Sequence, residues 1–376
     1  MFSNAIKLFT LNGFDIKLDP SWALIAALIT WSLSQQYFPT VYPDQTIATY
    51  VAMAIAAMLC FFASLLLHEL AHSIVARRLG MSITGITLFL FGGVAELESE
   101  PRSANVEFWV ALAGPAMSLS LAFGFWVLSL TTTAVSAAEP LSQVLAYLAM
   151  INLVLALFNL VPAFPLDGGR VLRAYLWNKT GDPLKATETA AKSGAVFAYV
   201  LMALGVLALF QGAIVAALWQ IMIGGFLLIA ARSSYQDQLA RVVFDKKSVG
   251  DIMHRDPVTV GPDMTLAEFV NTIVLRQGLS FVPVVEDDIL LGHMDKTILA
   301  GIDRENWEST RVGDVFVGLE DSTRVGPEMP AHDLLSAISA TNTRKFLVTS
   351  DHRLLGVISL SDLARYLTWA APSQRS

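Results

Sequence analysis

Three long stretches of this chain, residues 18–76, 103–169 and 193–231, contain no lysine or arginine. Each stretch holds apolar runs of about 20 residues, the length of helix that crosses a hydrocarbon layer of about 30 Å. Hydrophobic residues make up 54% of the 376 residues and charged residues only 15%, against about 25% charged in a soluble domain, which rules out a wholly soluble enzyme. We predict six transmembrane helices, near residues 21–38, 47–76, 106–132, 142–164, 193–209 and 212–231.

Basic residues lie between these stretches, for example at Arg77, Arg78 and Arg102 and in the segment 170–192. Cytoplasmic loops of membrane proteins carry an excess of lysine and arginine. We therefore expect a multi-pass protein of the cell (inner or plasma) membrane with both termini in the cytoplasm. The formal net charge of −7 argues against a nucleic-acid partner, because binding nucleic acid needs clustered basic residues.

The segment 82–103, between the second and third predicted helices, is too short to cross the membrane twice and too rich in β-branched residues to be a helix. Its residues alternate on both sides of Gly92-Gly93, which predicts a β-hairpin that turns at the two glycines. An open sheet edge cannot face lipid. We expect this membrane-associated hairpin to lie against the protein or at the cytoplasmic interface.

Hydrophobicity drops after Arg232, and the sequence that follows contains an internal repeat. VGDIM at 249–253 returns as VGDVF at 312–316, and LLG at 290–292 returns at 354–356, with offsets of 63 and 64 residues. Each copy predicts a helix, two strands and a closing helix. The pattern resembles a tandem pair of cystathionine-β-synthase (CBS) domains, which implies a soluble α+β module.

The sequence thus predicts an α-helical polytopic membrane domain, with six transmembrane helices and a membrane-associated β-hairpin, followed by a tandem CBS module. We place the membrane domain at residues 1–231, a linker at 232–247, the first CBS repeat at 248–305 and the second at 306–376. CBS pairs often dimerise, so the resemblance also implies a homodimer.

The sequence HELAH, from His68 to His72, is the sharpest chemical signal in the chain. Histidines four residues apart lie one above the other on a helix, so both imidazoles can bind one zinc ion while Glu69 addresses a water molecule there. The alternative is an interfacial His–Glu pair at a helix end. A zinc site needs a third ligand, and Asp167 in NLVPAFPLDGG is the candidate, although on spacing alone it could equally be the N-cap of the following helix.

HELAH together with NLVPAFPLDGG, some 95 residues later, resembles the site-2 protease family of intramembrane metalloproteases. The resemblance covers roughly residues 1–231. It implies one zinc ion per chain, bound by His68, His72 and Asp167, with Glu69 as the catalytic base.

Two further parts of the sequence match this family. The family's asparagine upstream of the LDG corresponds to Asn159, which the resemblance implies to bind substrate or to help stabilise the oxyanion. The glycine-rich hairpin matches the family's membrane-associated β-segment. Gly92 and Gly93 are therefore implied to form an edge that binds an unfolded substrate.

The CBS resemblance implies a site for an adenine nucleotide, ATP or AMP. Its signature is a serine or threonine three residues before an aspartate at the start of the closing helix, and the second repeat has Ser359 and Asp362 at these positions. The same two residues would also make a good capping pair for that helix. The first repeat has Asp295 and Ile298 instead, so we expect at most one competent site.

We therefore interpret the chain as a zinc-dependent intramembrane endopeptidase that cleaves transmembrane or membrane-proximal segments of substrate proteins, as in regulated intramembrane proteolysis. Its partners would be the lipid bilayer, a membrane-protein substrate and an adenine nucleotide that gates activity through the CBS pair. The alternative is a membrane transporter or channel regulated by CBS domains. A pore would be expected to place polar groups on several spans, whereas here they gather on the second and fourth.

Overall fold

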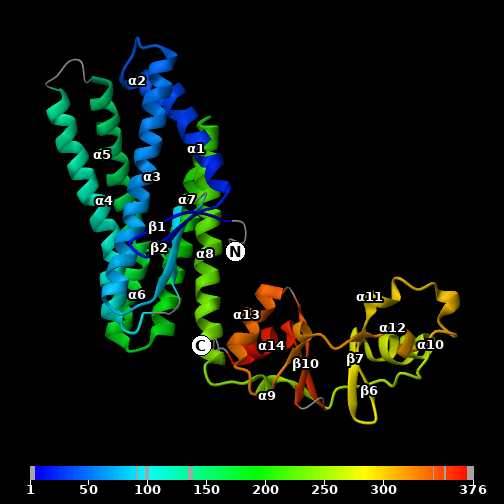
Figure 1. Ribbon diagram of the computed structural model, residues 1–376. Coiled ribbons are helices and arrows are strands. Elements are labelled where there is room, and N and C mark those ends of the chain that lie inside the picture. The colour runs from blue at the N-terminus through cyan, green and yellow to red at the C-terminus, as the bar shows by residue number, and fades with distance from the viewer. Residues whose placement is uncertain are drawn as a thin grey trace. The chain divides into compact units, whose positions relative to one another are not determined.

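The computed structural model describes residues 5–89, 92–97, 101–133, 139–341, 343–350 and 353–370. The chain divides into two compact units, Met1–Tyr235 and Gln236–Ser376, and α8 begins in the first and ends in the second (Figure 1). The elements up to α8 are β1 (Ile6–Leu11), β2 (Phe14–Leu18), α1 (Ser21–Ser32), α2 (Phe38–Val41), α3 (Ile47–Arg78), β3 (Ile83–Phe89), β4 (Gly92–Leu97), α4 (Ala104–Thr133), α5 (Glu139–Asn159), α6 (Asp167–Thr180), α7 (Pro183–Phe210) and α8 (Ile214–Phe244).

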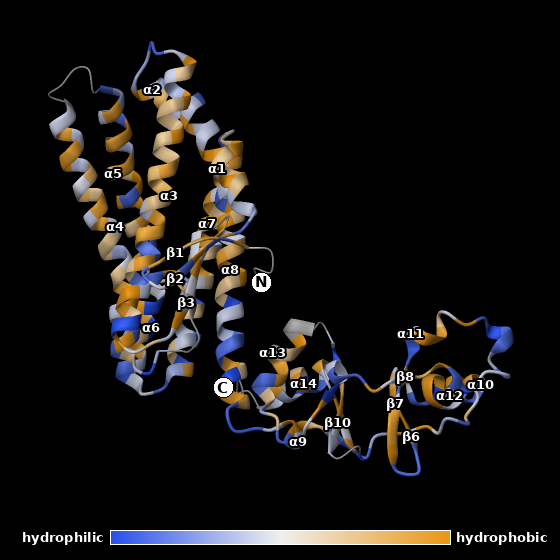
Figure 2. Ribbon diagram, viewed as in Figure 1, coloured by the Kyte–Doolittle hydropathy of each residue, from blue (hydrophilic) through white to orange (hydrophobic). Residues whose placement is uncertain are grey.

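Among the described residues, five helices are long and apolar enough to cross a membrane: α3, α4, α5, α7 and α8. Figure 2 shows hydrophobic residues along most of their length. α7 begins earlier than predicted, at Pro183, because Asp182 caps it by accepting hydrogen bonds from the backbone N–H groups of Leu184 and Lys185. α5 ends at Asn159 rather than at 164, shortly before Pro162, whose ring and missing N–H disfavour a further turn of helix.

The first predicted span, 21–38, is helical but divided. α1 continues into a π-helical segment, Leu33–Tyr37, and then into the short helix α2. The π-helical segment contains the polar pair Gln35-Gln36, and none of the three pieces alone has the length of a span. The prediction of six spans is therefore not confirmed.

The predicted hairpin is confirmed as β3 and β4, which pair antiparallel, with Phe89 opposite Gly92. Residues 90 and 91, between the two strands, lie outside the described residues. The hairpin belongs to a four-stranded sheet of order β1-β2-β3-β4, in which β2 and β3 are parallel. β1 and β2 were not predicted. They form a second hairpin that turns at Asn12 and Gly13, both with positive φ, which is the favoured two-residue turn between antiparallel strands.

One face of this sheet packs on α3. Phe14 and Ile16 of β2 and Ile86 and Leu88 of β3 are almost fully buried, in one cluster with apolar side chains of α3 such as Phe62. Burying a side chain of this size contributes about 1.5–3 kcal/mol. The sheet is therefore held against the helix that carries HELAH.

The second unit contains two small sheets, of order β5-β11-β10-β9 and β6-β7-β8. Its strands are β5 (His254–Arg255), β6 (Phe281–Glu286), β7 (Ile289–Asp295), β8 (Val317–Gly318), β9 (Arg324–Val325), β10 (Lys345–Ser350) and β11 (Arg353–Ser359). Its helices are α9 (Val249–Ile252), α10 (Leu266–Phe269) with a π-helical continuation Val270–Leu275, α11 (Lys296–Leu299), α12 (Val312–Val315), α13 (Ala331–Thr341) and α14 (Leu360–Ala370), with 3₁₀ turns at Arg304–Asn306 and Asp321–Thr323. The predicted helices and strands of both repeats are confirmed.

The two repeats exchange their first segments. Val249, at the start of the first repeat, is buried in the core of the second with Phe346 and Leu363. Val312, at the start of the second repeat, is buried in the core of the first with Val282. The strands follow the same pattern, since β5 pairs with β11 and β8 pairs with β7.

The end of α8 joins the second core as well. Phe244 is buried there, and its ring stacks on Tyr366 with centroids 6.0 Å apart. Residues 232–244, predicted as linker, are thus the last turns of a helix.

We expect a fragment of residues 248–305 to lack a cooperative thermal unfolding transition, because its core is missing Val312 and strand β8. A fragment of residues 236–376 contains both exchanged segments and should unfold in one transition. Circular dichroism during heating would measure the difference. A cooperative transition in the shorter fragment would contradict the exchange.

Candidate active site

HELAH lies in the second half of α3, where the one-turn spacing places both imidazoles on the same face of the helix. His68 is 2% exposed and His72 is 5% exposed. Two buried histidines inside an apolar helix are costly unless other groups bind them. The groups that contact their ring nitrogens therefore indicate the chemistry of the site.

Three side-chain atoms converge at this point. His68 Nε2 and His72 Nε2 lie 3.2 Å apart, and each lies 3.2 Å from Asp167 Oδ2. The structure thus brings together all three of the predicted metal ligands, which come from two segments 95 residues apart.

Asp167 begins α6 as its first residue, and the N-cap position belongs to Leu166. The carboxylate contacts the two histidines instead of capping the helix, so the capping alternative is wrong. The turn before it is tight: a Cβ added to Gly168 or Gly169 would collide with the backbone of residues 160–164. The two glycines after Asp167 therefore allow the chain to reach the histidines.

His72 is oriented by a backbone group. Its Nδ1 lies 2.6 Å from the carbonyl oxygen of Val110 in α4. Because a carbonyl can only accept a hydrogen bond, Nδ1 must carry the hydrogen, and in the neutral ring Nε2 then presents a lone pair. This is the tautomer that a metal-binding histidine adopts when its second nitrogen donates to a carbonyl.

The donor set fits a zinc ion. Atoms that bind zinc in a tetrahedron at about 2.0–2.1 Å lie roughly 3.3 Å from one another, and the three atoms here are separated by 3.2 Å. In the described part of the chain, this is the one group of at least three histidine, cysteine, aspartate or glutamate side chains placed closely enough to hold a metal ion.

Gly114 of α4 faces the same point. A Cβ built on Gly114 would overlap Nε2 of both His68 and His72, so only a residue without a side chain leaves room beside the ligands. The sequence does not predict this role, because Gly114-Pro115 within a span is equally typical of close helix packing and a kink. The number of residues between HELAH and Gly114 does not indicate their contact either.

Glu69 is adjacent to the edge strand of the sheet. A Cβ added to Gly93 of β4 would overlap Glu69 Cγ and lie 3.2 Å from its Oε1. In the described residues β4 pairs only with β3, so its outer edge remains open for another strand. The structure therefore brings Gly93, one of the two predicted substrate-binding glycines, to the predicted catalytic base; Gly92, before it, begins the strand.

Asn159 is the last residue of α5. α3 and α5 run side by side in the same direction, because Tyr50 and Met53 pack with Val144 and Leu148, and farther along both helices Asn152 Nδ2 donates to Ser64 Oγ over 3.3 Å. Seven residues on from this hydrogen bond, about 10 Å along each helix, lie Ala71 and Asn159. Helical rise alone therefore puts the end of α5 near the level of HELAH, and the catalytic role of Asn159 stays a prediction.

A buried ion pair joins the helix of Asp167 to the helix of Gly114. Arg173 Nη1 of α6 lies 2.9 Å from Glu107 Oε1 of α4, and the two side chains are 8% and 0% exposed. Removing one partner of such a pair leaves a buried charge and costs about 3–5 kcal/mol. The pair therefore keeps α6 in a defined position against α4.

Comparison with known proteins agrees with this geometry. The sequence profile of peptidase family M50 matches residues 56–137 and 129–204, and that of the CBS domain matches 249–293 and 312–368. Rip3 of Mycobacterium tuberculosis, which is named as a zinc metalloprotease, is 36% identical over 97% of this chain and 93% of its own. The chain belongs to peptidase family M50.

Another full-length relative supports the same assignment, and one solved structure is similar to part of the chain. Zinc metalloprotease MJ0392 of Methanocaldococcus jannaschii is 29% identical over 97% of this chain and 96% of its own. The solved structure of a site-2 protease from M. jannaschii is 30% identical, covering 61% of this chain and 95% of its own with a TM-score of 0.44. The predicted membership of the site-2 protease family and the predicted metallopeptidase class are confirmed, which decides against the transporter or channel alternative.

The CBS module of this M50 peptidase places Ser359 and Asp362 in direct contact. Asp362 Oδ2 accepts hydrogen bonds from the Ser359 hydroxyl at 2.6 Å and the Ser359 N–H at 3.0 Å, and Ser359 Oγ accepts one from the Asp362 N–H. This reciprocal pair caps α14. The capping interpretation is thus confirmed, and the nucleotide role stays a prediction.

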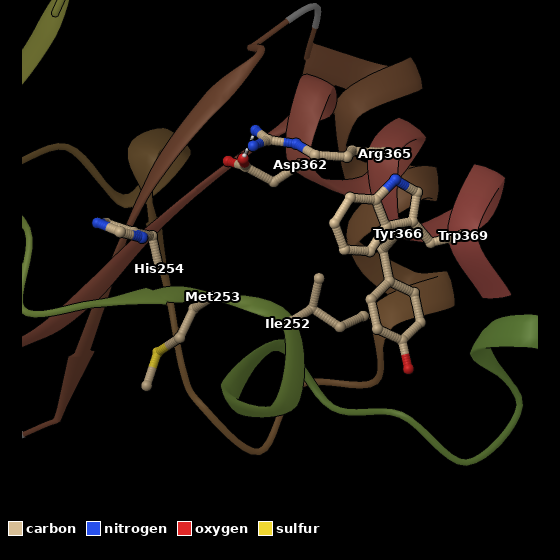
Figure 3. Close-up of a pocket in the computed structure, with 7 residues that line it drawn as sticks. All are labelled: Ile252, Met253, His254, Asp362, Arg365, Tyr366 and Trp369. Atoms are coloured by element: carbon tan, nitrogen blue, oxygen red, sulfur yellow. Dashed lines mark hydrogen bonds and ion pairs between the residues drawn. The ribbon is translucent and has the colours of Figure 1, made fainter.

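Asp362 also lines a cavity of about 450 Å³. Figure 3 shows Arg365, Tyr366 and Trp369 of α14 on one side of it and Ile252, Met253 and His254 on the other. Ser359 lines a second cavity, of about 330 Å³, with the basic residues Arg344 and Lys345. The two signature residues thus face different cavities at the start of α14.

In the first repeat, the residue that corresponds to Ser359 is Asp295, and its carboxylate is paired with a lysine. Lys345 Nζ, from the second repeat, donates to Asp295 Oδ2 at 2.9 Å and to Ser280 Oγ at 3.1 Å. Burial alone would raise the pKa of the Asp295 carboxyl, but hydrogen bonds from Thr297 and Lys345 lower it below its ordinary value. The contacts at Asp295 thus differ from those at Ser359, and the number of competent nucleotide sites stays a prediction.

We expect Gly114→Ala to abolish zinc binding, because its Cβ would overlap Nε2 of both histidines. Metal analysis of the purified protein should give about one zinc per wild-type chain and almost none for the variant. Gly124→Ala is the control, since a Cβ there meets no atom within 4 Å and lies on the same helix. A Gly114→Ala protein with wild-type zinc content would contradict this placement of the metal.

Proposed function

We propose that this protein is a zinc-dependent intramembrane endopeptidase that cleaves transmembrane or membrane-proximal segments of substrate proteins. One observation carries the proposal: the Nε2 atoms of two buried histidines and a carboxylate oxygen converge at 3.2 Å beside Glu69, and the histidines and Glu69 lie on α3, a helix that is long and apolar enough to cross a membrane. A peptidase centre on a membrane-spanning helix would act on peptide bonds that lie in or near the membrane.

His68, His72 and Asp167 would hold the zinc ion. When bound, zinc supplies a Lewis acid that polarises a carbonyl group and makes water a better nucleophile. Val110 keeps the His72 ring in the tautomer that binds metal, and the missing side chain of Gly114 leaves the space for it.

Glu69 acts as the general base. Its carboxylate accepts a proton from the water molecule that attacks the scissile carbonyl, and it returns that proton to the amide nitrogen as the peptide bond breaks. A carboxylate is needed because it can accept and then donate the same proton. Asn159, level with HELAH, would donate side-chain N–H groups to the substrate carbonyl or to the oxyanion that forms from it.

Strand β4 presents the substrate. A helical substrate must unwind before cleavage, because its carbonyl and N–H groups are otherwise bonded to each other. The open edge of β4 would pair with the unwound segment through main-chain hydrogen bonds, which makes few demands on its side chains. Gly92 and Gly93 lie at the end of this edge that approaches Glu69, so the paired segment would pass the base.

The cellular setting follows from charge. Basic residues between the apolar stretches favour an inner or plasma membrane protein with both termini in the cytoplasm. Residues 1–231 then form the peptidase domain, and the repeats at 248–305 and 306–376 form a cytoplasmic module. We propose that an adenine nucleotide at the second repeat regulates cleavage, and that the protein acts as a homodimer.

We expect Glu69→Gln to retain zinc and to lose cleavage of a membrane-protein substrate by about 10²–10⁴-fold, the usual contribution of a general base. Glutamine keeps the shape of the side chain but cannot take up a proton. Metal analysis and cleavage of a reconstituted substrate would measure the two properties. Glu188→Gln, a carboxylate paired with Lys192 on α7, is the control, and His68→Ala should lose both properties. Wild-type cleavage by Glu69→Gln would exclude Glu69 as the base.

We expect calorimetry on residues 236–376 to detect saturable binding of AMP or ATP, weakened by about 10–100-fold in Asp362→Asn. Asparagine can still cap α14, whereas a hydrogen bond from ribose to a charged carboxylate contributes about 1.5–3 kcal/mol. Asp321→Ala is the control, because its carboxylate is fully exposed. No heat with either nucleotide would exclude regulation in this form.

A further inference from the structure

A buried hydroxyl group contacts the second ring nitrogen of His68. Ser118 Oγ of α4 lies 2.8 Å from His68 Nδ1, and Ser118 is fully buried. The contact joins residues 50 positions apart in sequence. It lies on the side of the imidazole opposite to Asp167.

The direction of this hydrogen bond decides whether His68 can bind a metal. A hydroxyl can donate or accept. If it donated to Nδ1, the ring hydrogen would sit on Nε2 and point at Asp167 and His72. If Nδ1 donates to Ser118 Oγ, the Nε2 lone pair is free for the metal. His72 has no such choice, because its partner is the carbonyl of Val110.

We propose that Ser118 is a positioning residue, whose hydroxyl accepts the His68 Nδ1–H and so holds that ring in the tautomer and orientation that present Nε2 to the metal. The inference rests on the proposed zinc-peptidase function and adds a residue to it. Groups of this kind behind a histidine ligand typically change metal affinity by about 10–100-fold.

The placement of Ser118 supports a built site rather than an incidental contact. Val110, Gly114 and Ser118 are spaced four residues apart, so they lie on one face of α4. The Val110 carbonyl is hydrogen-bonded to His72, and the Ser118 hydroxyl is hydrogen-bonded to His68. Gly114, between them, leaves space beside both Nε2 atoms. Ser120, on the other side of the same helix, is exposed, and its hydroxyl donates to the carbonyl of Ala116 in its own helix.

The test measures zinc affinity of the purified full chain by competition with a chromophoric chelator. Ser118→Ala and Ser118→Val remove the hydroxyl and should weaken zinc binding by about 10–100-fold. Ser118→Thr has the shape of valine but keeps the hydroxyl, and it should bind zinc more tightly than Ser118→Val. Ser120→Val is the matched control and should bind zinc as the wild type does.

The outcomes separate this inference from the proposed function. Zinc binding by Ser118→Ala equal to the wild type, or equal affinities of the threonine and valine variants, would overturn the role of the hydroxyl. If one of the larger variants does not fold, the comparison of Ser118→Ala with wild type decides alone. If the wild type itself binds zinc no better than His68→Ala does, the zinc-peptidase proposal fails, and the role of Ser118 fails with it.

Discussion

Two imidazole nitrogens and a carboxylate oxygen lie within 3.2 Å of one another in an apolar surrounding, and the rest of the membrane unit is arranged around this contact. Electron pairs at that distance repel, and burial removes the water that would solvate them. A zinc dication held by these three atoms would turn that repulsion into attraction. The protein holds the three atoms from separate directions: one turn of α3 sets the histidines, the proline-broken segment before α6 delivers Asp167, and α4 contacts both rings from behind.

In the part of the chain that the structure describes, the outer edge of β4 is open where the strand passes Glu69. Lipid does not tolerate an unpaired strand edge, so an edge near the depth of the metal site must lie in a protein-lined or wet space. Gly93 allows β4 to approach Glu69 to side-chain contact. A substrate strand that paired with this edge would receive its hydrogen bonds from the protein at the place where its own helix has unwound. In the proposed mechanism, the sheet would thus provide both binding energy and alignment for cleavage.

HELAH could be predicted from its spacing and the β3–β4 hairpin from its alternating residues. Asp167 could be predicted only through the resemblance of its segment to the family motif, because spacing alone left the capping role equally open. The α4 wall could not, since Val110 contributes a backbone carbonyl and Gly114 contributes the absence of a side chain, and neither has a local signature. The hairpin of β1 and β2 had a signal in Asn12-Gly13, but β1 is exposed at every residue and shows no alternation. Hydropathy also does not detect the π-helical segment that divides the first predicted span, and that span stays a prediction.

The two CBS repeats differ in their candidate nucleotide positions, and a side chain of the second repeat contacts the first. Lys345 belongs to the second repeat and lines the cavity beside Ser359, yet its ammonium group is bonded to Asp295 of the first. A phosphate group entering that cavity would compete with the Asp295 carboxylate for the Lys345 ammonium group, because phosphate and carboxylate oxygens accept hydrogen bonds from the same donors. Val249 and Val312 each complete the core of the opposite repeat, so the two repeats are packed as one module. The nucleotide regulation proposed above would then need only one competent site.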